Sequence, residues 1–103
     1  MNRTIDLDAT NWKSAEDFFN AILPAIGASP EHGHNLNALI DSMIFGGMNE
    51  LNPPYTIVIR NLATIPPPLR EHLTLFQRAL SQASTAFHQE EGKDVDVQLH
   101  LVP

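Results

Sequence analysis

The side chains that could do chemistry gather in one stretch of the sequence, from Glu31 to Met48. Its beginning, Glu31-His32-x-His34, carries a carboxylate and two imidazoles, which are side chains of the kinds that bind Zn²⁺. No third ligand follows at a recognised metal spacing, so the signal for a metal site is weak. A small metal-dependent enzyme stays open as an alternative, while the favoured interpretation has no metal, no cofactor and no catalytic residue.

Nucleophilic and phosphate-binding chemistry has no recognisable pattern in this sequence. It contains no cysteine, which excludes a thiol nucleophile and a disulfide scaffold and fits a reducing compartment. It contains no glycine-rich phosphate loop and no nucleophile elbow, and nothing in it brings its serines, histidines and aspartates together. We therefore expect a protein that is not an enzyme and that works in the cytoplasm.

Charge and composition narrow the class of partner. The 103 residues include 12 acidic and 6 basic side chains, for a formal charge of −6. That balance argues against direct nucleic-acid binding, which needs lysine and arginine clusters, and it suits a basic protein partner. The N-terminus lacks a basic segment followed by an apolar one, so we expect no signal peptide. The apolar runs are far shorter than about 20 residues, so we expect no membrane span.

The rest of the sequence must fold into a domain that positions this stretch. An apolar fraction of 43% suffices for one core, and no linker divides residues 1–103, so we expect a single domain. Hydrophobic periodicity predicts, in order, a strand at 3–7, a helix at 15–26, a helix at 36–44, a strand at 55–59, a helix at 69–87 and a strand at 95–101. Because helices connect successive strands, the fold class is α/β with a small three-stranded parallel sheet.

Local signals refine these elements. Pro24 should end or kink the first helix, and Asn35 is placed to cap the second. Gly33 is expected in a tight turn with positive φ, and residues 90–94 are expected to form a charged loop. The strand at 55–59 is apolar throughout, which predicts a central strand covered on both faces.

The predicted helix at 36–44 has two different faces when its residues are placed about 100° apart. One face is a stripe of core residues, namely Leu36, Leu39, Ile40, Met43 and Ile44. Asn37 and Asp41 point away from this stripe and lie one turn apart, while Ala38 and Phe45 lie on the far side. An exposed phenylalanine beside an exposed carboxylate indicates a surface that binds another protein.

The segment Gly33-His34-Asn35-Leu36-Asn37-Ala38-Leu39-Ile40-Asp41 resembles the signature of the barstar family. Members of that family are intracellular protein inhibitors of a secreted bacterial ribonuclease. The family pattern here is Gly-x-Asn-Leu-Asp-Ala-Leu-x-Asp, and Asn37 is the one fixed position that differs. Residues 54–59 and 95–99 are similar to the family's second strand and its C-terminal strand.

This resemblance implies a barstar-like fold and a mode of action. Family members insert this helix and the preceding loop into a nuclease active site, where the carboxylate at the position of Asp41 takes the place of a substrate phosphate. The implied partner is a basic nuclease toxin domain bound 1:1 by a chain that is monomeric when free. The expected partner-binding residues are Glu31, His32, Gly33, His34, Asn35, Asn37, Ala38, Asp41, Ile44, Phe45, Gly46, Met48 and Arg78.

Several recognition positions depart from the family pattern. The family has two tyrosines where this chain has Glu31 and His32, a tryptophan where it has Ile40, and an acidic residue where it has Arg78. The family tryptophan just after this helix is also missing. These departures favour a different target, which we interpret as the nuclease domain of another toxin, with this chain as its immunity protein. A barstar-like module that regulates a protein other than a nuclease is the alternative.

Overall fold

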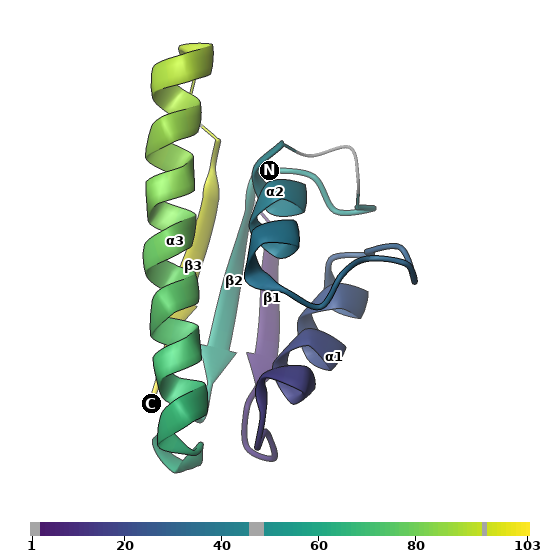
Figure 1. The fold of residues 1–103 in the computed structure, drawn as a ribbon, viewed down its shortest axis with the longest axis vertical. Coiled ribbons are helices and arrows are strands. Elements are labelled where there is room, and N and C mark those ends of the chain that lie inside the picture. Colours follow the sequence, from purple (N-terminus) through teal and green to yellow (C-terminus); the bar gives the residue numbers. More distant parts are fainter. Residues whose placement is uncertain (1–2, 46–48, 94) are drawn as a thin grey trace.

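A computed structural model describes residues 3–45, 49–93 and 95–103. Its elements are β1 (Arg3–Asp8), α1 (Ala15–Ala25), α2 (Leu36–Phe45), β2 (Tyr55–Arg60), the 3₁₀ turn η1 (Leu62–Thr64), α3 (Pro67–Glu91) and β3 (Val97–Leu101) (Figure 1). The predicted order of strands and helices is therefore confirmed. None of the helices in the described ranges is long and apolar enough to cross a membrane.

The three strands form one parallel sheet in the order β1-β2-β3. The register aligns Ile5 with Ile57 and Ile57 with Leu99, so the buried faces of all three strands coincide. Because parallel neighbours need a crossover, α1 and α2 connect β1 to β2, and α3 connects β2 to β3. The three helices pack on the sheet as predicted, which confirms the α/β fold class.

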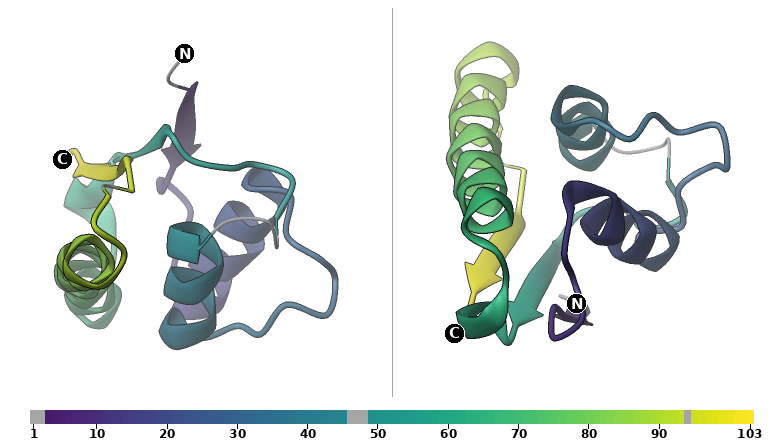
Figure 2. Two further views of the ribbon diagram at one scale, coloured as in Figure 1. Left: turned by 90° about the horizontal axis from the view of Figure 1, so that it is seen from above. Right: turned by 60° about the horizontal axis from the view of Figure 1, so that its bottom comes forward.

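β2 is the central strand of the sheet, as predicted, but the prediction that both of its faces are covered is wrong. All three helices lie on the same side of the sheet, as the view from above shows (Figure 2). Both crossovers have the same hand and run in the same direction along the sheet, and this geometry leaves the other face open. On that open face Thr56 is only 8% exposed and Val58 is half-buried, since the side chains of β1 and β3 flank them, whereas Arg60 is exposed.

Several element ends differ from the predictions by a turn or less. α1 continues through Pro24 to Ala25 before it ends. α3 includes two of the residues expected in the charged loop and ends at Glu91, and its C-cap residue Gly92 has a φ of 69°. β3 begins at Val97 rather than Val95, although Val95 still packs against the core. The end of α3 is closed by a hydrogen bond from the Gly92 N–H to the His88 carbonyl (2.9 Å), which sequence periodicity does not reveal.

An aromatic cluster joins α1 to α3 at the centre of the core. Phe18 is fully buried, and its ring lies 5.0–5.9 Å, centroid to centroid, from four others. These are the rings of Trp12, Phe19, His72 and Phe76. Dense packing of these rings thus holds α1, which precedes α2 in the chain, firmly against α3.

Gly27 ends α1 with a φ of 70°, and its carbonyl accepts a hydrogen bond from the Glu50 N–H (3.1 Å). A Cβ at Gly27 would lie 2.4 Å from the Glu50 Cβ. We expect Gly27→Ala to lower the free energy of unfolding by more than Gly92→Ala. Gly92 has nearly the same φ (69°), but no atom of the residues that the structure describes lies within 4 Å of an added Cβ. The control should lose only the left-handed strain of about 1–2 kcal/mol. Urea denaturation measures both, and equal losses would contradict the predicted clash.

Candidate protein-binding surface

α2 presents a polar face away from the core. Asn37 and Asp41 are exposed, as predicted, while the core stripe is buried apart from half-buried Leu36. Phe45 follows Asp41 after one further turn and is 60% exposed. Asn37, Asp41 and Phe45 therefore line up along the helix, and we refer to these three residues as the α2 ridge.

The α2 ridge begins at a capped helix end. The Asn35 Oδ1 accepts a hydrogen bond from the Ala38 N–H (2.8 Å), which confirms Asn35 as the cap. Gly33, however, is not in the positive-φ region, which contradicts the expected turn. A Cβ at Gly33 would lie 2.9 Å from the Asn35 Nδ2, so a larger residue there would press on the amide group of the cap side chain.

The loop before α2 is attached to two helices through its histidines. His32 Nδ1 lies 2.8 Å from the Gly33 carbonyl oxygen, and His32 Nε2 lies 2.9 Å from the Ser42 Oγ of α2. His34 Nδ1 lies 2.5 Å from a Glu16 carboxylate oxygen of α1, and its ring stacks on Phe19 with centroids 5.8 Å apart. The two imidazoles thus bind different helices. In the described ranges no three potential metal ligands lie close together.

The acidic side chains in and around this segment differ in whether they already have a hydrogen-bond or ion-pair partner within the protein. The Ser29 hydroxyl donates to the Glu31 carboxylate and lowers the pKa of Glu31. Glu16 is bonded by His34. Asp41, by contrast, makes no hydrogen bond or ion pair with any residue that the structure describes. It is an exposed carboxylate held on a rigid helix and available to a partner.

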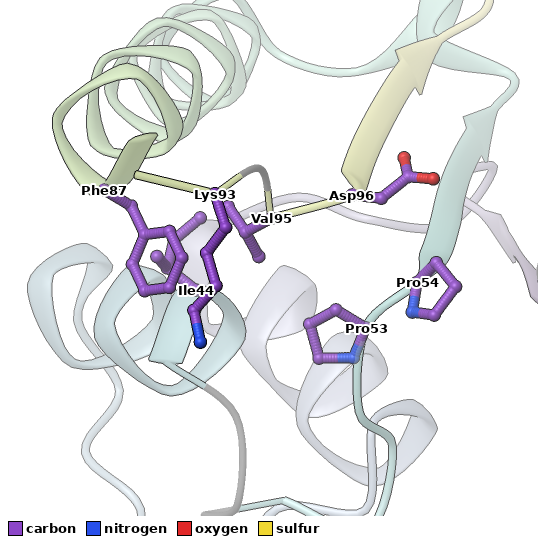
Figure 3. A pocket seen from close by; sticks show the side chains of 7 residues that line it. All are labelled: Ile44, Pro53, Pro54, Phe87, Lys93, Val95 and Asp96. Carbon is purple, nitrogen blue, oxygen red and sulfur yellow. The ribbon is translucent and has the colours of Figure 1, made fainter. Parts of the chain in front are cut away.

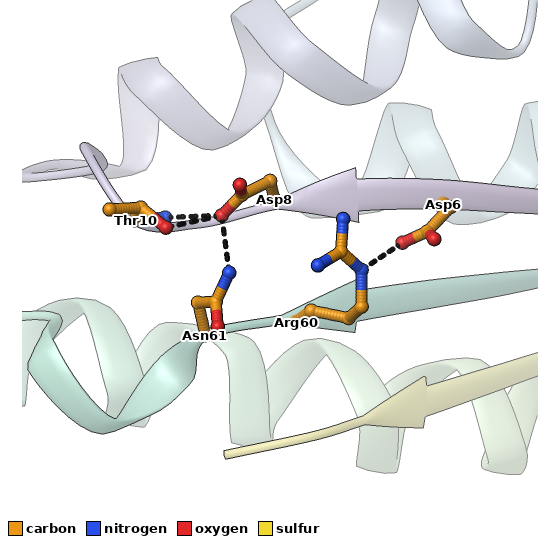
Figure 4. A network of polar contacts seen from close by, with 5 residues as sticks. All are labelled: Asp6, Asp8, Thr10, Arg60 and Asn61. Carbon is orange, nitrogen blue, oxygen red and sulfur yellow. Dashed lines mark hydrogen bonds and ion pairs between the residues drawn. The ribbon is translucent and has the colours of Figure 1, made fainter.

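A second acidic group lies far from the α2 ridge, at the carboxyl ends of β1 and β2 (Figure 4). Arg60 Nε donates to Asp6 Oδ1 at 2.6 Å, and Asn61 Nδ2 donates to Asp8 Oδ1 at 2.8 Å. Thr10 also donates hydrogen bonds to the Asp8 Oδ1. The hydrogen bond from Asn61, followed in effect by those from Thr10, lowers the pKa of Asp8 to about 2. The network joins β1 to β2 and uses its charges internally, so we assign it a structural role.

The C-terminal end of the α2 ridge adjoins α3. Phe45 packs edge-on against Phe87 of α3, with ring centroids 5.6 Å apart. Phe87 also lines a hollow of about 340 Å³ (Figure 3), whose lining residues are Ile44, Pro53, Pro54, Phe87, Lys93, Val95 and Asp96. Ile44 is only 3% exposed, so this predicted contact residue belongs mainly to the core.

The remaining predicted contact residues lie in different surroundings. Arg78 is exposed on α3, and because it follows Phe76 by about 200° around the helix it points away from the core. Ala38 is half-buried beside the cap. Gly46 and Met48 lie outside the described residues. Sequence reasoning missed Ser42, which is 1% exposed, because a lone serine between apolar helix positions gives no signal of a distant partner.

His72 of α3 makes the core sensitive to acid. Its ring packs edge-on against Phe18 and Phe19, and its Nδ1 is buried without a hydrogen-bond partner among the described residues. Burial lowers its pKa below the ordinary 6.5. The unfolded chain therefore binds this proton at a higher pH than the folded chain does. The stability that the neutral ring supports is present above about pH 6.5 and is lost as the pH falls through the lower, folded pKa.

We expect His72→Phe to flatten the fall in unfolding free energy between about pH 7 and pH 5. Phenylalanine keeps the edge-on ring packing and has no proton to bind. Urea denaturation of both proteins at each pH measures the effect. Identical pH dependence in the two proteins would show that His72 does not cause it.

A comparison with known protein families finds a match. The family model described as Barstar (barnase inhibitor) matches residues 2–100, which is nearly the whole chain. No curated protein matches the chain. The matched range includes the loop, the α2 ridge and all three strands.

Proposed function

The chain belongs to the Barstar (barnase inhibitor) family, and from that premise we propose that it is an immunity protein that binds and blocks a bacterial ribonuclease toxin. In this proposal it acts in the cytoplasm as a monomer, binds its target 1:1 and is not an enzyme. The contact surface consists of the loop before α2, the α2 ridge and the exposed part of α3 near Arg78.

The observation that carries the proposal is that the Asp41 carboxylate is exposed and available for binding. A ribonuclease must gather positive charge to bind phosphate and to stabilise its transition state. A carboxylate presented by a helix can bind that cluster through charge-assisted hydrogen bonds, in the manner of a substrate phosphate. Asp41 is exposed and has no partner among the described residues, so it need not break an internal bond in order to bind.

The neighbours of Asp41 support the same function. Phe45, one turn away, supplies an exposed aromatic ring that is already held by Phe87. Aromatic residues of this kind often contribute most of the energy in protein interfaces. The net charge of −6 would attract a basic enzyme over a distance of about one Debye length. Glu31, His32 and Arg78 differ from the family pattern, and these changes favour a toxin other than barnase.

A capture experiment tests the proposal. The purified protein is immobilised, partners are recovered from the native cells, and each recovered protein is assayed for RNA cleavage. We expect one basic ribonuclease, whose activity falls to zero when the inhibitor reaches an equal molar amount. A captured partner that does not cleave RNA would instead support the regulatory alternative. Barnase serves as the specificity control and should be inhibited less strongly than the native target.

A further inference from the structure

The hydrogen bonds of His32 indicate a function different from direct partner contact. Both nitrogens of its ring are occupied, one by the Gly33 carbonyl (2.8 Å) and the other by the Ser42 hydroxyl (2.9 Å). We propose that His32 and Ser42 form a latch that holds the loop 28–34 against α2 in the conformation that binds the partner. His32 is then a positioning residue, and the consequence for binding rests on the proposed inhibitor function.

The donors and acceptors around the His32 ring determine which of its nitrogens carries the hydrogen. The Gly33 carbonyl can only accept a hydrogen bond, so His32 Nδ1 must carry the hydrogen. In a neutral ring Nε2 is then an acceptor, and the Ser42 hydroxyl must donate to it. The same hydroxyl also lies 3.0 Å from the Leu39 carbonyl, but its one hydrogen cannot serve both acceptors fully. The geometry therefore assigns the Nδ1–H tautomer to neutral His32.

The position of the latch explains why it controls the binding surface. Ser42 is 1% exposed and follows Asp41 directly, so the latch ties the loop to the same turn of α2 that presents the carboxylate. On the opposite side, His34 ties the loop to Glu16 of α1. A loop attached at two points, His32 and His34, is already ordered there before the partner arrives, so less conformational freedom is lost on binding.

The tautomer is the first test, and it uses the free protein. Nitrogen NMR of the imidazoles at about pH 8, where an ordinary imidazole is neutral, separates protonated from unprotonated ring nitrogens. We expect His32 to carry its hydrogen on Nδ1. A hydrogen on Nε2 would be incompatible with donation to Gly33 and would overturn the latch.

Side-chain substitutions test the connection between the loop and α2. His32→Phe keeps a ring without nitrogens, His32→Gln can still accept from Ser42, and Ser42→Ala removes the same bond from the other side. We expect His32→Phe to speed amide hydrogen exchange about tenfold at residue 32 and at Ala38, whose N–H groups bond to Ser29 and Asn35. Exchange in β2 should not change.

The controls separate a latch from a general loss of stability. His32→Gln should restore part of the protection in the wild-type background but none in a Ser42→Ala background. Amide exchange in the double variant His32→Phe/Ser42→Ala should be no faster than in the faster-exchanging of the two single variants, since both substitutions remove one shared bond. Additive effects, or faster exchange in β2 as well as in the loop, would overturn the proposal.

Binding to the captured ribonuclease completes the test. We expect His32→Phe to weaken binding about tenfold, while His32→Gln recovers part of that loss. An unchanged affinity together with a loosened loop would overturn the positioning role and leave the inhibitor function intact. If no ribonuclease is captured, the tautomer and exchange measurements still decide whether the latch exists.

Discussion

Replacing Asp41 with alanine is expected to weaken binding of the ribonuclease partner severely and to leave the fold nearly unchanged. Asp41 is exposed and unbonded in the described part of the chain, so its removal should change the unfolding free energy by less than about 0.5 kcal/mol. In the complex, its loss would leave buried positive charges unpaired. Removing one partner of a buried, hydrogen-bonded charge pair at an interface weakens the binding free energy by about 2–5 kcal/mol. The complex of barnase with its inhibitor is a known example of such losses.

Two further variants isolate the charge and its place. Asp41→Asn keeps the size of the side chain and removes its charge, so its affinity should lie between those of the wild type and Asp41→Ala. Asp6→Asn changes the net charge by the same amount on the open face of the sheet, and its amide oxygen can still accept from Arg60. Calorimetry should find near-normal binding for Asp6→Asn. Normal binding by Asp41→Ala would show that this carboxylate is not the phosphate mimic.

Replacing Phe18 with alanine is expected to lower the unfolding free energy by about 3–5 kcal/mol. Its fully buried ring contacts Trp12, Phe19, His72 and Phe76, and these rings cannot all close over the cavity left behind. A domain of this size has only about 5–15 kcal/mol of stability in total. The variant should therefore unfold at much lower urea concentration, and part of it will be unfolded at physiological temperature.

Phe45→Ala is the matched control, because it makes the same substitution at a ring that is 60% exposed. It breaks one edge-on contact with Phe87, so we expect a stability loss of about 1 kcal/mol or less. Its affinity for the partner should fall by more than its stability does. Similar stability losses in the two variants would show that Phe45 belongs to the core rather than to the α2 ridge.

Several features of the fold could be predicted because they depend on residues that are neighbours along the chain. Hydrophobic periodicity predicted a strand at 95–101, where β3 lies, and Asn35 predicted the helix cap that its Oδ1 forms. Helical spacing also separated Asn37 and Asp41 from the core stripe correctly. Side-chain direction repeats with a fixed period in helices and strands, so a few residues suffice to assign the faces.

The contacts between segments that are distant in the sequence could not be predicted in this way. The sequence did not predict that the helices would share one side of the sheet, which leaves Arg60 on an open face. Nor did it indicate that His34 would bond Glu16, or that His32 would bond a buried Ser42. These contacts depend on the angles and distances at which whole elements pack, and no local period encodes them. The stretch from Glu31 to Met48 could thus be recognised from its residues, while its loop required the fold to show which side chains hold it and which remain available to a partner.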